Sequence, residues 1–269
     1  MKISLIISTY NWPDALKLCL TSILNQSAIP DDIIIADDGS TPSTKEIIDY
    51  FKKTSKRKIK HVWHSDQGFK LAEIRNKAIA EAEGDYIIQV DGDVILHQDF
   101  IKDHKNFAKP NSFVKGRRLM IGKTKSESLL KNKSTSVSFL SSDVKMREHG
   151  IRIPFFNEIF ISKEEKSADG VMGSNMAFWR KDFVDANGYN NALKGWGAED
   201  KELAQRFVNL GLVKRKIKFG AIQYHIYHPK CDSTKHDVQM QEIERLKISK
   251  QTRCANGLDQ ISKEYTVYE

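Results

Sequence analysis

The first hundred residues alternate between short apolar runs and longer segments with a helical repeat of apolar positions. Short apolar runs bounded by polar residues predict buried strands. The runs span residues 3–8, 33–36, 59–63 and 86–90. The helical segments between them span residues 14–25, 44–53 and 71–82. Strand–helix alternation of this kind predicts a mostly parallel sheet with helices on both faces, an α/β fold of the Rossmann type.

This alternation ends near residue 98, and the remaining pattern is more varied. We expect strand character at 113–121 and 171–179, and a Lys- and Ser-rich excursion over the cleft at 123–145. The pattern at 213–224 predicts paired strands. Helices are expected at residues 100–107, 199–210 (ended by Gly211) and 234–251. Because no repeat or linker divides the chain, we expect a single compact domain with a C-terminal helical extension over residues 234–269.

Size and cysteine content restrict the class of protein. None of the apolar stretches in the 269 residues approaches the roughly 20 residues that span a bilayer. The apolar run at the N-terminus is too short for a signal peptide, and no small-residue cleavage site follows it. The three cysteines, Cys19, Cys231 and Cys254, are far apart, which argues against a disulfide framework or a zinc site. We therefore expect a cytoplasmic protein.

The formal net charge of +8 is concentrated in two segments. Residues 52–60 hold six basic residues and no acid, and residues 109–133 hold eight basic residues against Glu127 alone. Such segments attract anionic lipid or phosphate-bearing substrates, or they form an ordinary solvated surface. We expect no nucleic-acid partner, because the chain has no zinc-finger spacing, RNP sequence or recognition helix.

A polar cluster follows each of the four predicted strands of the first half. The clusters are Thr9-Tyr10-Asn11, Asp37-Asp38-Gly39-Ser40, His64-Ser65-Asp66 and Asp91-Gly92-Asp93. Ligands of such sheets bind beyond the carboxyl ends of the strands. Four polar clusters at one edge therefore predict a ligand site.

The last of these clusters is typical of a metal site. Buried carboxylates are costly unless they are paired or bind a cation, and Gly92 lets the backbone bend close to a ligand. Oxygen ligands such as Asp91 and Asp93 suit Mg²⁺ or Mn²⁺. The alternative is a simple Asp-Gly turn between two strands.

Two further residues of the first half have open interpretations. Asp38 could accept hydrogen bonds from a nucleobase or ribose, or could start the next helix. Arg75 lies beside the apolar stripe of its helix, where it could reach a phosphate or pair with Glu73 or Glu81. The chain lacks the glycine-rich dinucleotide fingerprint after the first strand, which argues against NAD and FAD, and it lacks the phosphate-loop lysine motif, which excludes a P-loop NTPase.

The segment from Gly195 to Asp200 is the second strong signal. Trp196 offers a flat apolar surface between two glycines, on which a sugar ring can stack. Asp200 shares the apolar stripe of the helix that follows, and the helix N-terminus would keep it ionised. An ionised carboxylate at a cleft can act as a general base. The alternative is an acidic helix start without further role.

Two histidines, His225 and His228, follow a predicted strand near the end of this pattern. Alternation along a strand would place them on opposite faces. We therefore expect only one of them to complete a metal site begun by the aspartates.

Together, these clusters resemble the family 2 glycosyltransferases with the GT-A fold. The likeness rests on residues 8–11, 37–40, the Arg75-Asn76 helix, and Asp91-Gly92-Asp93 as the DXD motif. Residues 173–179 and 195–200 are similar to the acceptor region of β-1,4-galactosyltransferases and chondroitin-polymerase-type enzymes. The resemblance extends to about residue 230 and leaves the last part of the chain unmatched.

The resemblance implies a metal-dependent, inverting hexosyltransferase. It would move Gal, GalNAc, Glc or GlcNAc from a UDP-sugar with Mn²⁺ or Mg²⁺ as the cofactor. Residues 1–97 would form the nucleotide-sugar-binding half of the domain and residues 98–233 the acceptor-binding half.

Roles for individual residues also follow from the resemblance. The residues implied to bind the donor are Thr9, Tyr10, Asp38, Arg75, Asp91 and Gly92. Asp93 would be the principal metal ligand, with Asp91 on the ribose or the metal and His225 as a further ligand. Asp200 would be the base, and Trp196, Glu199 and Asn175 would bind the acceptor. Ala198 departs from the family pattern, which has a second glycine here, and its methyl group would narrow the acceptor loop.

We expect a saccharide or a lipid-linked saccharide as the acceptor, in bacterial polysaccharide or lipopolysaccharide synthesis. The basic segments would then favour peripheral contact with an anionic membrane. One alternative is a sugar-phosphate nucleotidyltransferase, but residues 8–13 lack the glycine-rich basic loop that such an enzyme needs. Another alternative is a non-catalytic module that binds polyanions.

Overall fold

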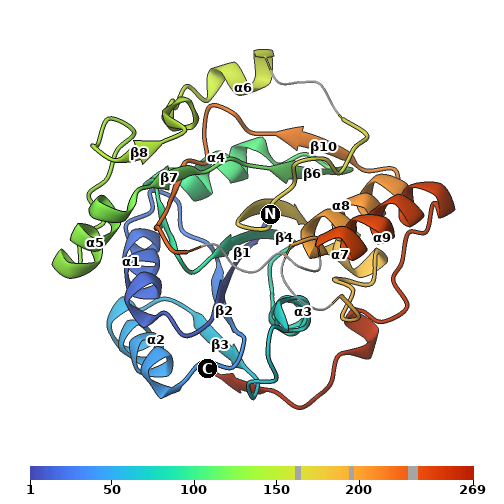
Figure 1. The fold of residues 1–269 in the computed structure, drawn as a ribbon, viewed down its shortest axis with the longest axis horizontal. Coiled ribbons are helices and arrows are strands. Elements are labelled where there is room, and N and C mark those ends of the chain that lie inside the picture. The colour runs from blue at the N-terminus through green and yellow to red at the C-terminus, as the bar shows by residue number, and fades with distance from the viewer. Residues whose placement is uncertain (161–164, 194–196, 230–235) are drawn as a thin grey trace.

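A mixed eight-stranded sheet forms the centre of the molecule (Figure 1). The computed structural model describes residues 1–160, 165–193, 197–229 and 236–269. The strand order is β10 (Val213–Lys216), β6 (Ser112–Lys115), β9 (Asn175–Trp179), β4 (Tyr86–Asp91), β1 (Ile3–Thr9), β2 (Asp32–Asp37), β3 (Ile59–Trp63) and β12 (Thr266–Tyr268). Strands β4, β1, β2 and β3 are parallel, whereas β9 runs antiparallel to both β4 and β6.

Helices cover both faces of this sheet, because its strands are apolar on both sides. Helices α1 (Pro13–Leu24), α2 (Pro42–Ser55) and α4 (Phe100–Phe107) cover one face, and α3 (Leu71–Ala80), α7 (Arg180–Asp185) and α8 (Glu199–Asn209) cover the other. Within β1, Leu5 packs in the first layer with Leu16 of α1, and Ile6 packs in the second with Phe207 of α8. Strand alternation thus produces two separate cores.

A smaller sheet and several short elements complete the fold. Its order is β5 (Val94–Leu96), β11 (Gln223–His225), β7 (Leu119–Ile121) and β8 (Val144–Lys145). The remaining elements are α5 (Lys123–Asn132), the 3₁₀ turn Arg147–Gly150, α6 (Phe155–Phe160), α9 (His236–Ser249) and the 3₁₀ turn Leu258–Gln260. None of the described helices combines the length and apolar composition needed to cross a bilayer.

The predicted α/β architecture is confirmed, and the first four strands lie within one residue of their predicted bounds. Three details of the second half differ. Strand β9 begins only at Asn175, because residues 171–174 turn toward α8. The predicted pairing within 213–224 is wrong, since β10 and β11 belong to different sheets. After α9 the C-terminal extension is not helical throughout, because it returns to the central sheet as β12.

The parallel register brings the polar clusters of the first half to one edge of the sheet. Ser8 pairs with Asp91 across β1 and β4, and Thr9 pairs with Asp37 across β1 and β2. Strand β9 is antiparallel to both β4 and β6, so β6 runs in the same direction as β4 and also ends at this edge. Side chains from both halves of the chain can therefore meet there.

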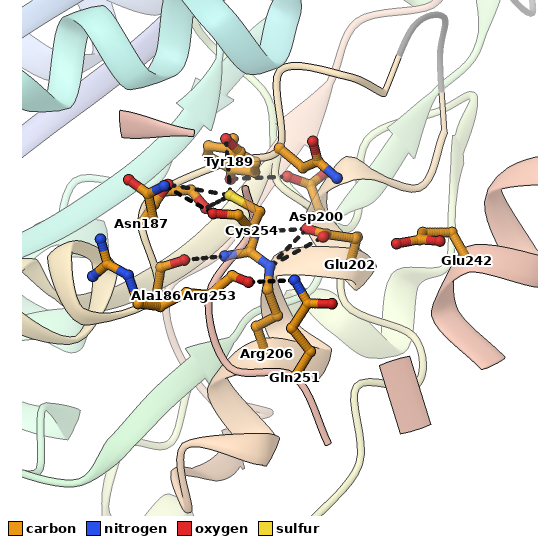
Figure 2. Close-up of polar contacts among 12 residues, drawn as sticks. Ala186, Asn187, Tyr189, Asp200, Glu202, Arg206, Glu242, Gln251, Arg253 and Cys254 are labelled. Carbon is orange, nitrogen blue, oxygen red and sulfur yellow. Dashed lines mark hydrogen bonds and ion pairs between the residues drawn. The ribbon is translucent and has the colours of Figure 1, made fainter. Parts of the chain in front are cut away.

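A buried ion pair fixes α8 to the segment that follows α7. Arg206 and Glu202 are one turn apart on α8, are almost inaccessible to solvent, and are joined by a contact of 2.6 Å between Nη2 and Oε2. The Arg206 guanidinium also donates to the carbonyl of Ala186, as Figure 2 shows. Beside it, Asn187 donates to the carbonyl of Cys254 in the C-terminal extension. This group connects α8, the end of α7 and the C-terminal segment.

We predict that Arg206→Met lowers the free energy of unfolding by about 3–5 kcal/mol, because it leaves the Glu202 carboxylate buried without a counter-charge. Urea unfolding measures this loss. The double variant Arg206→Met/Glu202→Leu should recover most of it. Arg245→Met is a matched control, since Arg245 pairs with Glu242 on the exposed side of α9 and should change stability by about 0.5 kcal/mol or less. Equal losses at Arg206 and Arg245 would contradict the prediction.

Candidate active site

Asp91-Gly92-Asp93 forms the turn between β4 and β5, at the edge where the polar clusters meet. The Gly92 N–H donates to the carbonyl of Ser8 over 2.7 Å. A Cβ atom at Gly92 would lie 3.0 Å from that carbonyl oxygen and 3.2 Å from Thr9. A side chain at this position would therefore have to displace β1 or the turn by a few tenths of an ångström. The two interpretations of this tripeptide are compatible, because the turn also directs its aspartates into a site.

Asp93 lies against two histidines. The Nε2 atoms of His225 and His228 are each 3.3 Å from Asp93 Oδ2, and the ligand atoms of all three residues lie within 4.8 Å of one another. The prediction that only one histidine faces the site is wrong. Strand β11 ends at His225, so strand alternation no longer applies at His228.

The states of Asp93 and His225 suit a divalent cation. Asp93 Oδ1 is buried and has no hydrogen-bond partner within the described part of the chain. Burial alone would raise the pKa of Asp93, but the hydrogen bond with His228 and the charges of His225 and Arg118 lower it. Burial lowers the pKa of His225, whereas the hydrogen bond with Asp93 raises the pKa of His228. An ionised carboxylate and a neutral imidazole are the forms that ligate metals.

Arg75 joins the two halves of the site. Its side chain is 2% exposed. It donates from Nε to Ser8 Oγ at 3.0 Å, from Nη2 to Asp91 Oδ1 at 3.1 Å, and from Nη1 to Asp200 Oδ1 at 2.9 Å. Glu199 Oε1 lies 3.4 Å from the same Nη1. Sequence patterns left the partner of Arg75 open between a phosphate and Glu73 or Glu81, and the structure instead gives it carboxylates from β4 and α8.

Three carboxylates around one guanidinium give the site an excess of negative charge. Burial raises the pKa of Asp91 to about 6, although the charge of Arg75 opposes this. Burial and the nearby Asp200 raise the pKa of Glu199 to about 7. The surrounding carboxylates outweigh the effect of burial on Arg75 and raise its pKa. Additional positive charge would be accommodated readily here.

Asp200 stands at the first turn of α8 and is held from three directions. Its Oδ2 accepts the N–H of Gly173 at 2.7 Å, and its Oδ1 accepts from Arg75 and lies 3.0 Å from the Tyr189 hydroxyl. A Cβ atom at Gly173 would lie 2.3 Å from Oδ1, so a side chain there would displace the carboxylate. The Tyr189 hydroxyl is also 2.9 Å from Gln89 Oε1 (Figure 2 shows Tyr189 directed at Asp200). Asp200 is thus rigidly oriented and still 16% exposed.

The predicted donor-binding residues of the first half surround the same edge. Thr9 ends β1, and the Tyr10 ring is exposed, with its hydroxyl donating to Asp66 at 3.0 Å. Both Asp38 oxygens already have partners, because His64 Nε2 lies 2.8 Å from Oδ1 and the Lys70 N–H donates to Oδ2 over 2.9 Å. The structure therefore holds Asp38 firmly at the end of β2.

Asn175 is the predicted acceptor residue that the geometry assigns elsewhere. It is completely buried, and its Oδ1 lies 2.9 Å from His104 Nε2. Its amide nitrogen donates to the carbonyls of Arg117 and Ala221. The side chain therefore belongs to the framework under the site. The sequence did not predict this, because the motif does not indicate which way Asn175 faces. Trp196, a second predicted acceptor residue, lies outside the described residues, and the third, Glu199, lies beside Arg75.

Sequence reasoning missed three residues of the site. Gly173 and Tyr189 hold Asp200, and Arg118 lies 3.5 Å from Ser174 while its charge acts on Asp91 and Asp93. Arg118 stood within a noted basic segment, and Gly173 within a noted motif. Tyr189 carried no signal, since its function depends on a contact with Asp200 made across a loop.

The arrangement supplies complementary groups at one edge. A carboxylate with two imidazoles can hold a cation, and a cation at that position can receive an anionic leaving group. Asp200, held by hydrogen bonds on the other side of Arg75, can accept a proton. A metal-assisted displacement with one base requires these two groups.

Two family models match the chain. The model described as glycosyl transferase family 2 matches residues 4–185, more than half of the sequence. The model described as the N-terminal domain of galactosyltransferase matches residues 155–229, which include Gly173, Tyr189 and Asp200. The two models overlap at 155–185 and together cover both sides of the Arg75 contacts.

Several curated proteins are similar in sequence. Chondroitin synthase of Escherichia coli is 27% identical over 248 residues, which cover 83% of this chain and 34% of that protein. A poly(ribitol-phosphate) β-glucosyltransferase of Bacillus spizizenii is 36% identical over 113 residues, 41% of this chain and 18% of that protein. The chain thus spans about a third or less of the length of these two relatives.

Solved structures share the fold, which is GT-A. S. aureus TarS 1-349 in complex with UDP superimposes with a TM-score of 0.61 at 18% identity, covering 93% of this chain and 65% of that one. A mannosyltransferase from Pyrobaculum calidifontis in complex with GDP-Man and Mn²⁺ has a TM-score of 0.55 at 16% identity, covering 89% and 60%. At these identities the likeness concerns the fold alone.

We predict that Glu199→Gln stabilises the metal-free protein at alkaline pH. The pKa of Glu199 rises from an ordinary 4.5 to about 7 on folding, so the folded state binds more protons than the unfolded chain within this window. The free energy of unfolding must then fall as the pH rises from 4.5 through 7, and the uncharged variant should not show this decrease. Urea unfolding should give the variant an advantage of about 1–3 kcal/mol at pH 8 that nearly vanishes toward pH 4.5.

Glu244→Gln serves as the control for this pH dependence. Glu244 lies on the exposed surface of α9, where its side chain is 60% accessible. Its substitution should leave the pH profile of stability unchanged. A Glu199→Gln variant that is less stable than the wild type at pH 8 would show that the Glu199 charge is favourable in the fold.

Proposed function

Because the chain belongs to glycosyl transferase family 2, we propose that it transfers a hexose from a UDP-sugar to a saccharide acceptor with inversion at the anomeric carbon. One observation carries the proposal. Arg75 connects Asp91, next to the Asp93–His225–His228 cluster, to Asp200 on α8. This contact holds a site for an anionic leaving group and a base at a fixed separation.

The donor would lie along the carboxyl ends of β1, β2 and β4. Thr9, Tyr10 and Asp38 would surround the uracil and ribose, and Asp91 and Gly92 would adjoin the ribose and diphosphate. The TarS complexes with UDP and UDP-GlcNAc support a uridine donor. The sugar would then be GlcNAc, GalNAc, Glc or Gal. Arg75, buried beneath these groups, would position carboxylates and would not have to contact the nucleotide.

Asp93, His225 and His228 would hold the metal. Magnesium is usually bound through carboxylates and substrate phosphates, so two imidazoles beside one carboxylate favour Mn²⁺ over Mg²⁺. When bound, the cation neutralises negative charge on the leaving diphosphate. The Mn²⁺ complex of the archaeal mannosyltransferase supports this choice.

Asp200 would deprotonate the acceptor hydroxyl. A carboxylate offers about four lone-pair sites, and Gly173, Arg75 and Tyr189 use three of those of Asp200. The remaining site would accept the proton of the sugar hydroxyl. A single base facing the anomeric carbon supports one displacement with inversion, whereas retention by double displacement requires a second carboxylate as nucleophile. Glu199 and Trp196 would position the acceptor, and the Ala198 methyl group would narrow its loop.

The surface around 123–159 supports peripheral contact with an anionic membrane. Six large apolar side chains are exposed within twenty residues of this segment: Leu140, Met146, Ile151, Ile153, Phe155 and Ile159. Basic side chains are exposed on the same segment: Lys123, Lys131, Lys133, Lys145 and Arg147. Figure 1 shows α5, β8 and α6 along one border of the molecule. Apolar and basic residues together suit a charged bilayer surface better than a free polysaccharide.

This border adjoins the site. His149, in the 3₁₀ turn between β8 and α6, is hydrogen-bonded at 2.9 Å to the carbonyl of Arg118, whose charge acts on Asp93. A membrane on this side would bring a lipid-linked acceptor close to Asp200. We therefore place the reaction in bacterial polysaccharide synthesis at the cytoplasmic face of the membrane.

We predict that Asp200→Asn lowers the rate of sugar transfer by about 10²–10⁴-fold, the usual contribution of a general base. UDP release with Mn²⁺ and an accepted saccharide measures the rate, and calorimetry measures UDP affinity, which should stay within about twofold. Asp185→Asn, at the exposed end of α7, is the matched control and should keep full activity. Undiminished turnover of Asp200→Asn would exclude Asp200 as the base.

The membrane contact is tested with phosphatidylcholine vesicles that contain or lack phosphatidylglycerol. We predict sedimentation with the anionic vesicles only. Lys131→Gln/Lys133→Gln should weaken binding by about 2 kcal/mol, roughly 1 kcal/mol per lysine near the surface. Phe155→Ser should also weaken it, whereas Ile248→Ser, at an exposed position of α9, should not. Failure of the wild type to sediment, or equal loss with Ile248→Ser, would remove the membrane assignment.

A further inference from the structure

A cluster of lysines lies at the ends of β6 and β10, on the α8 face of the sheet. The two strands are parallel, with Lys115 opposite Lys216 and Phe113 opposite Lys214. Phe113 packs in the same core as Phe207 of α8. Residues two apart on a strand face the same way, so Lys115, Lys214 and Lys216 share this side. We call these three residues the β6–β10 lysine cluster.

The cluster has more positive charge than its neighbours balance. Glu165 pairs with both Lys214 and Lys216, at 3.2 and 2.6 Å, and Lys214 also donates to the carbonyl of Asp169. Lys115 is half-buried and has no ion pair or hydrogen bond to its ammonium group among the described residues. A half-buried ammonium that no protein carboxylate pairs with is available to an anionic ligand.

The electrostatic state of Lys115 agrees with this geometry. Burial and the charges of Lys214, Lys216 and Arg117 lower the pKa of Lys115 to about 8. A bound anion would reverse that effect and restore the full positive charge. The surroundings of the ammonium group thus favour an anionic ligand.

The cluster lies close to the base. One short segment, residues 170–174, contacts both. A Cβ atom at Gly170 would lie 2.6 Å from Lys115 Nζ, and Gly173 donates to Asp200 Oδ2. Gly170 and Gly173 are three residues apart, so at most about 10 Å of extended chain separates the two contacts. An acceptor whose hydroxyl contacts Asp200 would therefore extend in the neighbourhood of Lys115.

The donor diphosphate is an unsuitable occupant of this cluster. Its proposed position is at Asp93, on the far side of Arg75. The basic side chain after β6 whose charge acts on Asp91 and Asp93 is Arg118, which is not part of the cluster. An uncharged saccharide would leave the cluster uncompensated. The anion must therefore come from the acceptor.

We propose that the β6–β10 lysine cluster binds an anionic group of the acceptor saccharide, a carboxylate of a hexuronate or a phosphate of a phosphodiester chain. The inference rests on the proposed transferase function and narrows its acceptor to acidic saccharides. Lys115 supplies the unpaired charge and Lys216 supports it from the neighbouring strand. Selectivity arises because a neutral acceptor would not offset the repulsion among these cations.

Isothermal titration in the presence of UDP and Mn²⁺ tests the proposal with three probes. The first is a tetrasaccharide of alternating N-acetylhexosamine and hexuronate, the second is the same compound with its carboxyl groups reduced to alcohols, and the third is a short ribitol-phosphate oligomer. We expect the wild type to bind at least one acidic probe about 10-fold to 100-fold more tightly than the reduced one, the range of a charged hydrogen bond. The two acidic probes distinguish carboxylate from phosphate as the source.

Lys115→Gln should abolish this preference, and Lys115→Arg should retain most of it. Lys53→Gln, in the basic segment of α2, is the matched control and should change nothing. Equal affinity of the wild type for acidic and reduced probes, no binding of either acidic probe, or an equal effect of Lys115→Gln on all probes would overturn the proposal. UDP affinity should be unchanged in every variant, so a wild type that fails to bind UDP would instead count against the transferase function.

Discussion

One buried guanidinium determines how the two halves of this site face each other. Arg75 is rooted in α3, within the first half of the chain, yet its nearest anion is Asp200 on α8, 125 residues later. Because Asp91 and Asp200 accept hydrogen bonds from the same side chain, the positions of both carboxylates depend on one guanidinium. The separation of Asp91 from Asp200 is therefore set by a single buried group.

The same arrangement leaves the site poised for cationic ligands. Burial raises the pKa of Asp91 to about 6 and that of Glu199 to about 7. The single positive charge of Arg75 is insufficient to balance three carboxylates. Ionising these buried acids costs more free energy than ionising acids on an ordinary protein surface. A divalent cation would reduce that cost. At the ends of β6 and β10, the lysine cluster has the opposite imbalance. Two regions of opposite charge excess at one edge of the sheet suit ligand groups of opposite charge in separate places.

The first half of the fold and site was predictable because its signals are local. Apolar runs define β1 to β4, and the parallel-sheet rule brings Asp38, Asp91 and Asp93 to one edge before any contact is known. Asp200 was predictable from its place on an otherwise apolar helix stripe. These inferences need only the periodicity of one element at a time.

The remaining features depend on contacts that periodicity does not encode. His228 joins His225 because β11 ends at His225, three residues before His228, so strand alternation does not separate the two side chains. Asn175 faces inward, where three framework groups use its amide. Tyr189 reaches Asp200 across a loop, and the β6–β10 pairing that gathers the lysines joins strands a hundred residues apart. Each of these depends on where a segment meets a distant one.

The C-terminal strand β12 has a consequence for how the chain is made. It pairs antiparallel with β3, placing Val267 opposite Val62, and so covers an edge whose backbone groups would otherwise be open to other chains. Ribosomes add about 5–20 residues per second, so roughly 10–40 s separate the synthesis of β3 from that of its cover. During this interval the nascent sheet presents an unpaired strand edge. Chaperone binding at β3 during translation would protect that edge until β12 is made.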